Sequence, residues 1–249
     1  MLWDDCDGTQ HIRPISGKLF RMVESQEQVA TLSYVDTLEE QALLEEMLES
    51  SKPALPVHSG NYHYLLKTPF RYPPLPWGSR FGRSHEPAIF YGASSVDTTL
   101  AESAYYRLVF WHSMDAVPVK QTMRSEHSLF SAQYLSSLGL KLQLPPCSDY
   151  ETQLSHPQQY TQPQLLGSAM RKAGVEAFEY RSARDPKKGS CVGLFTPAAL
   201  RHRRPQEMTQ WLCEVSVNEV AFKQVGQTDV FRFGLEIFLY QGELPLPSA

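Results

Sequence analysis

The sequence predicts a mixed α+β fold, and three observations support that prediction. The length of 249 residues and the ordinary apolar and charged fractions indicate a globular chain with a substantial core. Many segments rich in β-branched and aromatic residues follow one another along the chain. Few of them are separated by helical segments, which argues against a regularly alternating parallel α/β sheet.

The first predicted helix spans residues 37–52, TLEEQALLEEMLESSK. Its leucines alternate with glutamates, Thr37 is suited to cap its start, and Pro53 stops it. We expect an amphipathic helix that covers one side of the core and exposes an acidic face. Prolines and aromatics then alternate between residues 52 and 92, an irregular path in which YHYLL, residues 62–66, is interpreted as a strand.

The stretch from Trp77 to Arg107 predicts a glycine-rich turn, a short apolar strand and a buried helix that begins near Val96. A further helix is expected at residues 163–174, where Gly174 can form the C-cap. The tail 241–249 is predicted to be loosely held. The remaining predicted strands are residues 116–124, 128–134, 140–145, 175–180, 191–197, 207–217 and 219–225.

Charge and composition limit the functional classes. The net charge of −4 argues against nucleic acid as the main partner, and the basic run 201–205 is too short to change that conclusion. No secretory signal is apparent, and no apolar run approaches the roughly 18 to 20 residues that span a bilayer. We therefore expect a soluble, cytoplasmic protein.

No metal site is predicted from the cysteines and histidines. Cys6, Cys147, Cys191 and Cys213 lie far apart and form no CxxC or Cys/His ligand pair. In a cytoplasmic chain they are expected to be reduced and partly buried. The histidines show no metal-binding spacing either.

Glu102 is the unusual residue of the helix that begins near Val96. One side of the helical wheel carries Leu100, Ala104, Leu108 and Trp111, and much of the rest carries Tyr105, Val109 and Phe110. A carboxylate in such surroundings must meet an arginine, form hydrogen bonds or face a cleft. An ion pair with Arg107 or Arg80 is the structural interpretation, and an active-site cleft is the functional one.

Arg80 and Ser182 are weak signals when each is considered alone. Arg80 lies in GSRFGR, where a guanidinium beside glycine amides suits a phosphate. Ser182 lies between a predicted strand and a turn, without the elbow or histidine of a serine nucleophile, so it either caps the turn or hydrogen-bonds a ligand. No GxGxxG or GxxxxGK[ST] pattern is present, so a bound nucleotide is not held by a Rossmann or P-loop device.

Four residues together resemble the RES domain family, named for its arginine, glutamate and serine. They are Arg80 in GSRFG, Tyr91 in IFYGA eleven residues later, Glu102 in TTLAES eleven after that, and Ser182 in YRSARDPKKGSCVGLF. The resemblance implies a mostly antiparallel sheet core with flanking helices, similar to ADP-ribosyltransferases. It also implies the toxin half of a bacterial toxin–antitoxin pair.

The predicted domain is a single RES domain over residues 1–249, with its motif region at about 70–200. Arg21 in LFRMVES resembles the family's first arginine segment more loosely. Residues 22–69 hold a helical and proline-rich insertion relative to compact family members, which separates Arg21 from Arg80.

The resemblance implies that NAD+ is the substrate and that no metal takes part. Cleavage of the nicotinamide–ribose bond develops positive charge on the ribose, which a carboxylate stabilises, and this role falls to Glu102. Arg80 would hold the pyrophosphate, Tyr91 would orient nicotinamide and its ribose, and Ser182 would hydrogen-bond the substrate. Arg21 is a further candidate for binding NAD+.

Several functional alternatives stay open at this point. ADP-ribose can pass to water or phosphate, or to a cellular protein, in which case the chain is an ADP-ribosyltransferase. An inactive binding module, in which Arg80 and Glu102 form a structural ion pair, is the alternative from another class. The toxin hypothesis also implies a cognate antitoxin with a helix-turn-helix DNA-binding domain, and it implies no direct contact of this chain with nucleic acid or membrane.

Overall fold

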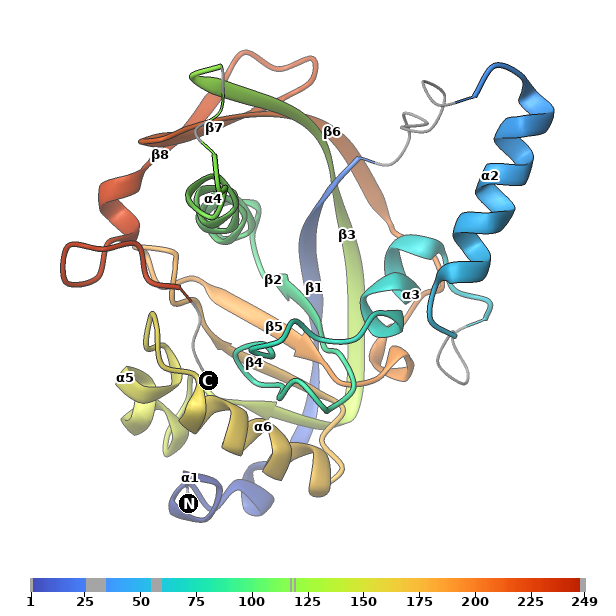
Figure 1. The fold of residues 1–249 in the computed structure, drawn as a ribbon. Helices are drawn as coiled ribbons and strands as arrows, with labels where there is room; N and C mark the ends of the chain where they lie inside the picture. Colours follow the sequence, from blue (N-terminus) through green and yellow to red (C-terminus); the bar gives the residue numbers. More distant parts are fainter. Residues whose placement is uncertain (1, 26–34, 55–59, 117, 119, 247–249) are drawn as a thin grey trace.

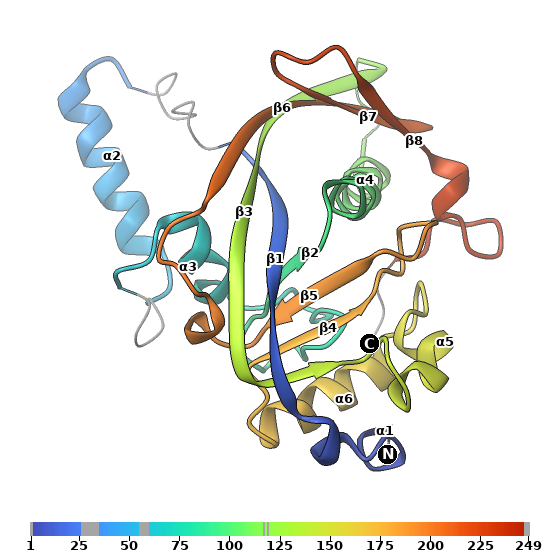
Figure 2. The ribbon, with the colours of Figure 1, turned by 180° about the vertical axis from the view of Figure 1, so that it is seen from behind.

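Eight strands form one sheet with helices around it (Figures 1 and 2). The structure is a computed structural model that describes residues 2–25, 35–54, 60–116, 118 and 120–246. The sheet order is β1-β2-β5-β4-β3-β6-β7-β8. The strands are β1 (Arg13–Glu24), β2 (Phe90–Ala93), β3 (Thr122–Lys141), β4 (Ala177–Arg181), β5 (Ser190–Leu194), β6 (Glu207–Ser216), β7 (Glu219–Gln224) and β8 (Val230–Gly234).

The sheet is mostly antiparallel, as predicted. Of the strand pairs within the described residues, only β3 and β4 run parallel, where Gly139 lies opposite Ala177. β1 pairs with β2 at one point and with β3 along most of its length. Strands β1, β2, β5, β4 and β3 therefore form a closed cycle of pairings, and β3 also carries β6 on its first half.

The helices lie on different sides of this curled sheet. In both views α4 runs between the β1–β2 region and the β6–β8 extension, whereas α6, α5 and α1 gather beyond β4 and β5 (Figures 1 and 2). The helices are α1 (Leu2–Asp5), α2 (Leu38–Ser51), α3 (Tyr64–Arg71), α4 (Val96–His112), α5 (Glu151–Leu154) and α6 (Thr161–Lys172). Short 3-10 turns occupy Gly8–His11, Cys147–Tyr150, Pro197–Ala199 and Leu235–Phe238.

Helix α4 forms where the sequence predicts it. The Ser95 side chain caps its start by accepting from the amide of Thr98 at 3.2 Å. Leu100, Ala104 and Leu108 are fully buried and belong to a cluster with side chains of β6 and β7. This face holds the helix against the sheet and fixes the direction of its opposite face.

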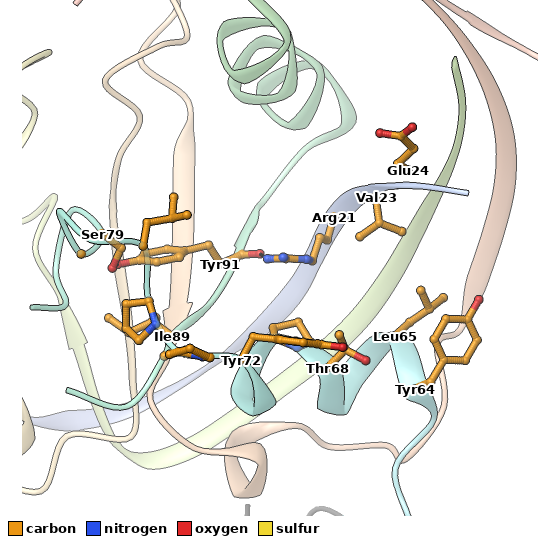
Figure 3. Close-up of a pocket in the computed structure, with 16 residues that line it drawn as sticks. Arg21, Val23, Glu24, Tyr64, Leu65, Thr68, Tyr72, Ser79, Ile89 and Tyr91 are labelled. Carbon is orange, nitrogen blue, oxygen red and sulfur yellow. Dashed lines mark hydrogen bonds between the residues drawn. The ribbon is translucent and has the colours of Figure 1, made fainter. Parts of the chain in front are cut away.

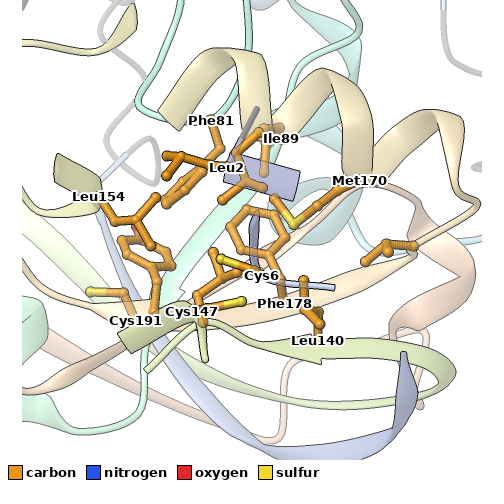
Figure 4. Close-up of a cluster of buried hydrophobic side chains, with 14 of the residues drawn as sticks. Leu2, Cys6, Phe81, Ile89, Leu140, Cys147, Leu154, Met170, Phe178 and Cys191 are labelled. Carbon is orange, nitrogen blue, oxygen red and sulfur yellow. The ribbon is translucent and has the colours of Figure 1, made fainter. Parts of the chain in front are cut away.

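A second cluster lies between α6, α1 and strands β4 and β5 (Figure 4). Phe81 joins it from the turn before β2 and packs edge-on against Phe178 and Tyr180, with ring centroids 5.0 and 4.9 Å away. The cluster also contains Cys6, Cys147 and Cys191, and all four cysteines of the chain are free and buried. The cysteines are more completely buried than the partial burial that the sequence led us to expect.

The strand predicted at residues 62–66 is wrong, because Tyr64–Arg71 is helix α3. Its apolar residues are spaced for one face of a short helix, and Leu65, Leu66 and Phe70 are buried in a core cluster that includes Phe90 of β2. Pro69 lies late in the helix. The burial of this helical face outweighed the β-propensity of the tyrosines, so the segment is a helix.

Helix α2 matches its predicted range, with the Thr37 hydroxyl accepting from the amide of Glu40 at 3.1 Å. Its predicted packing on the core is wrong, because Leu43 and Met47 are 58% and 60% exposed. The helix is tied to the molecule by an ion pair between Arg71 and Glu49 at 2.6 Å. Residues 26–34 and 55–59, on either side of α2 and its flanking turns, lie outside the described residues.

Two other predictions need correction. The segments 116–124 and 140–145 supply only the ends of β3, which starts at Thr122 and ends at Lys141. The tail is not loosely held as far as residue 246, because Pro245 is buried and its carbonyl accepts from the Tyr105 hydroxyl. Residues 247–249 lie outside the described part of the chain.

Candidate functional site

A cavity of about 380 Å³ lies between α4, β1, β2 and the loops before β2 and after β4. We call it the carboxylate pocket, because Glu102 is the carboxylate among its described lining residues. Three arginines and a group of tyrosines line it as well. These are Arg21, Arg80, Arg184, Tyr91, Tyr106, Tyr160 and Tyr180.

Glu102 reaches the pocket from the second turn of α4 and is held by neutral donors. The Ser182 hydroxyl donates to Glu102 Oε1 at 2.5 Å, and the Cys191 thiol lies 3.7 Å from the same oxygen. No ion pair of Glu102 exists within the described residues, and Arg107 pairs instead with Glu24 at 3.2 Å. The structural ion pair of Glu102 with Arg80 or Arg107 is therefore absent from the described structure.

The loop after β4 docks on α4 at two points one helical turn apart. Ser182 contacts Glu102, and Asp185 accepts from the Thr98 hydroxyl at 2.9 Å. Gly189 makes this approach possible, since a Cβ there would lie 2.0 Å from Thr98 Oγ1. The loop therefore fixes both the helix and the orientation of the carboxylate.

Ser182 contacts Glu102 but is not among the described residues that line the cavity. Its hydroxyl donates to Glu102 and accepts from the amides of Arg184 and Asp185 at 3.1 and 2.9 Å. These three bonds use its one donor and both of its acceptor positions. The expected direct hydrogen bond from Ser182 to substrate does not fit this geometry, and the residue is a positioning group for Glu102.

Arg80 stands at the tip of a tight turn built on Gly78 and Gly82. Gly78 has φ +76°, and a Cβ there would lie 2.3 Å from the carbonyl oxygen of Gly82. The guanidinium stacks on the Tyr160 ring at 4.6 Å, and its Nη1 donates to the carbonyls of Leu154 and His156. Burial lowers the pKa of Arg80, but the nearby groups Tyr160, Glu102, Tyr180 and Tyr106 together raise that pKa above its ordinary value.

Tyr91 fixes this turn from β2. Its hydroxyl accepts from the amide of Phe81 at 3.1 Å and lies 2.9 Å from Ser79 Oγ. Burial raises the pKa of Tyr91 to about 12, so the phenol stays neutral at physiological pH. Tyr91 lines the pocket, and its hydroxyl also holds the turn that presents Arg80.

Arg21 extends from β1 to the backbone of β2. Its Nη1 donates to the carbonyl of Tyr91 at 2.6 Å, and its guanidinium lies 5.2 Å from the centre of the Phe90 ring. Its Nε is buried without a hydrogen-bond partner. Burial lowers the pKa of Arg21 to about 10, which leaves it cationic at neutral pH.

Arg184 and Tyr160 are site residues that the sequence reasoning missed. Arg184 Nη2 donates to the carbonyl of Pro157 at 2.6 Å and to the Tyr160 hydroxyl at 3.3 Å, and its guanidinium lies 3.5 Å above the Tyr105 ring. Tyr160 thus contacts both Arg80 and Arg184. Arg184 follows Ser182 by two residues, and this proximity could have identified it as a site residue. The sequence around Tyr160 contains no comparable indication of a site.

The charges of the pocket are unequal. Arg21, Arg80 and Arg184 make no ion pair with any carboxylate of the described residues, and Glu102 stands alone against them. The described residues include no cluster of three His, Cys, Asp or Glu that suits a metal ion. Such a pocket is suited to a ligand with an anionic part, which the arginines would bind, and an electron-deficient group, which would lie against the Glu102 carboxylate.

Fold and pocket together define a mixed α+β domain with a carboxylate and several arginines in one cleft. The family model of the RES domain matches residues 55–216, and the chain belongs to this family. No curated protein matches the sequence. One solved structure similar to the chain is the M. tuberculosis MbcT–MbcA toxin–antitoxin complex, at 11% identity and a TM-score of 0.49, covering 84% of this chain and 91% of that one.

Within the described residues, no helix is both long and apolar enough to cross a membrane.

Proposed function

We propose that this RES-domain protein cleaves the nicotinamide–ribose bond of NAD+ and transfers ADP-ribose to water or phosphate. The observation that carries the proposal is that one cavity is lined by Glu102 and by three arginines. Among the described residues, neither the carboxylate nor any of these arginines forms an ion pair. NAD+ has a pyrophosphate to match the arginines and a glycosidic carbon that becomes cationic. The family resemblance to ADP-ribosyltransferases supports the same chemistry.

In the proposed reaction, the arginines bind the pyrophosphate and Glu102 faces the nicotinamide ribose. As the C–N bond breaks, nicotinamide leaves as a neutral molecule with the bonding electrons, and the anomeric carbon gains positive charge. The Glu102 carboxylate stabilises that charge. The oxygen of water or phosphate then bonds to the anomeric carbon, and a water acceptor releases one proton to solvent.

Tyr91 and Tyr180 bring aromatic surface to this end of the pocket. Tyr91 packs near Tyr180, with ring centroids 6.3 Å apart and nearly perpendicular planes. Such a corner suits the flat nicotinamide ring. In the proposal these rings orient nicotinamide while Ser182 keeps Glu102 in place behind the ribose.

The biological setting we propose is that of a toxin acting in the cytoplasm and restrained by an antitoxin. This part of the proposal rests on family membership. The expected partner carries a helix-turn-helix domain, and this partner, not the chain described here, makes the contact with DNA. Induction of the toxin alone should arrest growth, and co-expression with a cognate helix-turn-helix antitoxin should restore growth. Arrest that persists with Glu102→Gln would contradict an NAD+-based toxicity.

The decisive experiment is to incubate the purified protein with NAD+ and measure nicotinamide by chromatography, with and without phosphate and with candidate proteins. Glu102→Ala should abolish release, whereas Glu46→Gln, a change of an exposed glutamate on α2, should not. Unchanged release by Glu102→Ala would refute the mechanism. Free ADP-ribose, a phosphorylated ADP-ribose or a labelled protein would identify the acceptor, and the last result would make the chain an ADP-ribosyltransferase.

A further inference from the structure

A second cavity, of about 390 Å³, adjoins the carboxylate pocket (Figure 3). We call it the α3 pocket, because Leu65, Thr68 and Pro69 of helix α3 form one of its walls. Arg21, Ser79 and Tyr91 line both cavities and lie on the opposite side of the α3 pocket from Thr68 and Tyr72. The two cavities are therefore neighbouring compartments that share one wall.

Arg21 is the cation at the boundary between the two compartments. One of its nitrogens is held by the Tyr91 carbonyl, but its Nε is buried without a partner. No carboxylate of the described residues pairs with it. Because this guanidinium lines both cavities and has no carboxylate partner among the described residues, an anionic oxygen at the boundary would be stabilised there.

The α3 pocket differs from the carboxylate pocket in its chemistry. Its described lining is mainly apolar and aromatic, and Arg21 is the only cationic side chain in it. Glu24 lies at its edge and is paired with Arg107 at 3.2 Å. Thr68 supplies a hydroxyl, and Tyr72 supplies a partly exposed ring. These groups suit an uncharged aromatic ligand with a few hydrogen-bonding atoms.

The sizes of the two compartments also suit a ligand with two halves. Each cavity is near the lower end of the range of roughly 300 to 1,000 Å³ that is usual for small-molecule sites. A dinucleotide consists of two nucleosides joined by a pyrophosphate. Two adjoining cavities with a cation between them match that division.

We propose that the α3 pocket binds the adenosine half of a dinucleotide whose pyrophosphate contacts Arg21 and whose nicotinamide riboside faces Glu102. This inference rests on the proposed function and adds a subsite to it. Helix α3 and the proline-rich segment after it then select dinucleotides over mononucleotides. The segment between Arg21 and Arg80 thereby contributes directly to substrate recognition.

The test uses equilibrium binding, so that it does not depend on turnover. NAD+ and nicotinamide mononucleotide, which lacks the adenosine half, are titrated calorimetrically into the full-length Glu102→Gln protein with and without Thr68→Trp. The indole should fill the α3 pocket and weaken NAD+ binding by at least about tenfold, while mononucleotide binding changes less than about twofold. Lys67→Trp places the same bulk on the neighbouring residue of α3, which does not line the pocket, and should alter neither affinity.

Unchanged NAD+ affinity in Thr68→Trp, an equal loss for both ligands, or no binding of NAD+ to the Glu102→Gln protein would overturn the subsite. A matching thermal midpoint for the two tryptophan variants establishes that both are folded. Failure of the proposed function has a different signature. Wild-type protein would then bind NAD+ with the Thr68-dependent affinity and release no nicotinamide.

Discussion

The two sides of the carboxylate pocket are held by different kinds of neutral partner. Glu102 is fixed by a hydroxyl and a thiol, from Ser182 and Cys191. Arg80 and Arg184 are fixed by backbone carbonyls and aromatic rings. Within the described residues neither side neutralises the other by an ion pair, so both charges remain available to a ligand.

This arrangement is unfavourable for folding and useful for binding. A partly buried charge without an opposite charge costs free energy that a ligand can return. If the proposed function holds, the carboxylate acts where charge develops in the reaction, whereas the arginines contact phosphates that do not react. The carboxylate side should then determine kcat and the arginine side should determine KM.

The largest expected effect is that of Glu102→Gln. The amide keeps the size of the side chain and removes the negative charge that stabilises the ribosyl cation. We expect kcat for nicotinamide release to fall by about 10³-fold, with the affinity for NAD+ altered only a few-fold. Initial rates and calorimetric titration measure the two quantities. A variant that loses affinity but keeps its rate would assign Glu102 to binding and reverse the comparison.

On the arginine side, Arg80→Gln should raise KM for NAD+ by roughly 30-fold, equivalent to about 2 kcal/mol for a charge-assisted hydrogen bond. kcat should change much less, because the pyrophosphate does not react. Arg201→Gln, in an exposed basic run, is the matched control and should leave both constants unchanged. A loss confined to kcat would contradict a pyrophosphate role for Arg80.

The two sides also differ in how well the sequence predicts them. Glu102 is predictable because a carboxylate in an otherwise apolar helix needs an explanation, and its spacing from Tyr91 and Arg80 matches a known family. Helix α4 itself follows from its N-cap serine and apolar faces. What the sequence does not show is that the loop after β4 packs on α4.

The packing of this loop depends on tertiary contacts between distant segments. The Ser182–Glu102 bond joins residues 80 apart in sequence, and the Arg80–Tyr160 contact also joins distant segments. The sequence therefore places Ser182 near the substrate, whereas the fold places it behind the carboxylate. For the same reason α3 was predicted as a strand, since its burial in a core cluster with residues of distant strands is not visible in local propensity.

A smaller effect is expected from Ser182→Ala, because it removes a positioning bond and leaves the charge. kcat should fall by roughly tenfold, in line with the loss of about 1 to 1.5 kcal/mol, and KM should stay nearly constant. The double variant with Glu102→Gln tests the coupling, since Ser182→Ala should cost little further rate once the carboxylate is gone. Fully additive losses would mean that Ser182 acts on the substrate by another route.

The smallest effect should come from Cys191→Ala. The thiol is a weak donor at 3.7 Å from Glu102 Oε1, and the much shorter Ser182 bond remains in the variant. Burial raises the pKa of Cys191 well above its ordinary value, so the side chain is a neutral thiol at physiological pH and not a nucleophile. We expect kcat to fall by less than about threefold.

A loss as large as that of Glu102→Gln, in a Cys191→Ala variant whose thermal midpoint shows intact folding, would mean that the sulfur itself takes part in the reaction. The carboxylate side of the pocket would then contain two reacting groups.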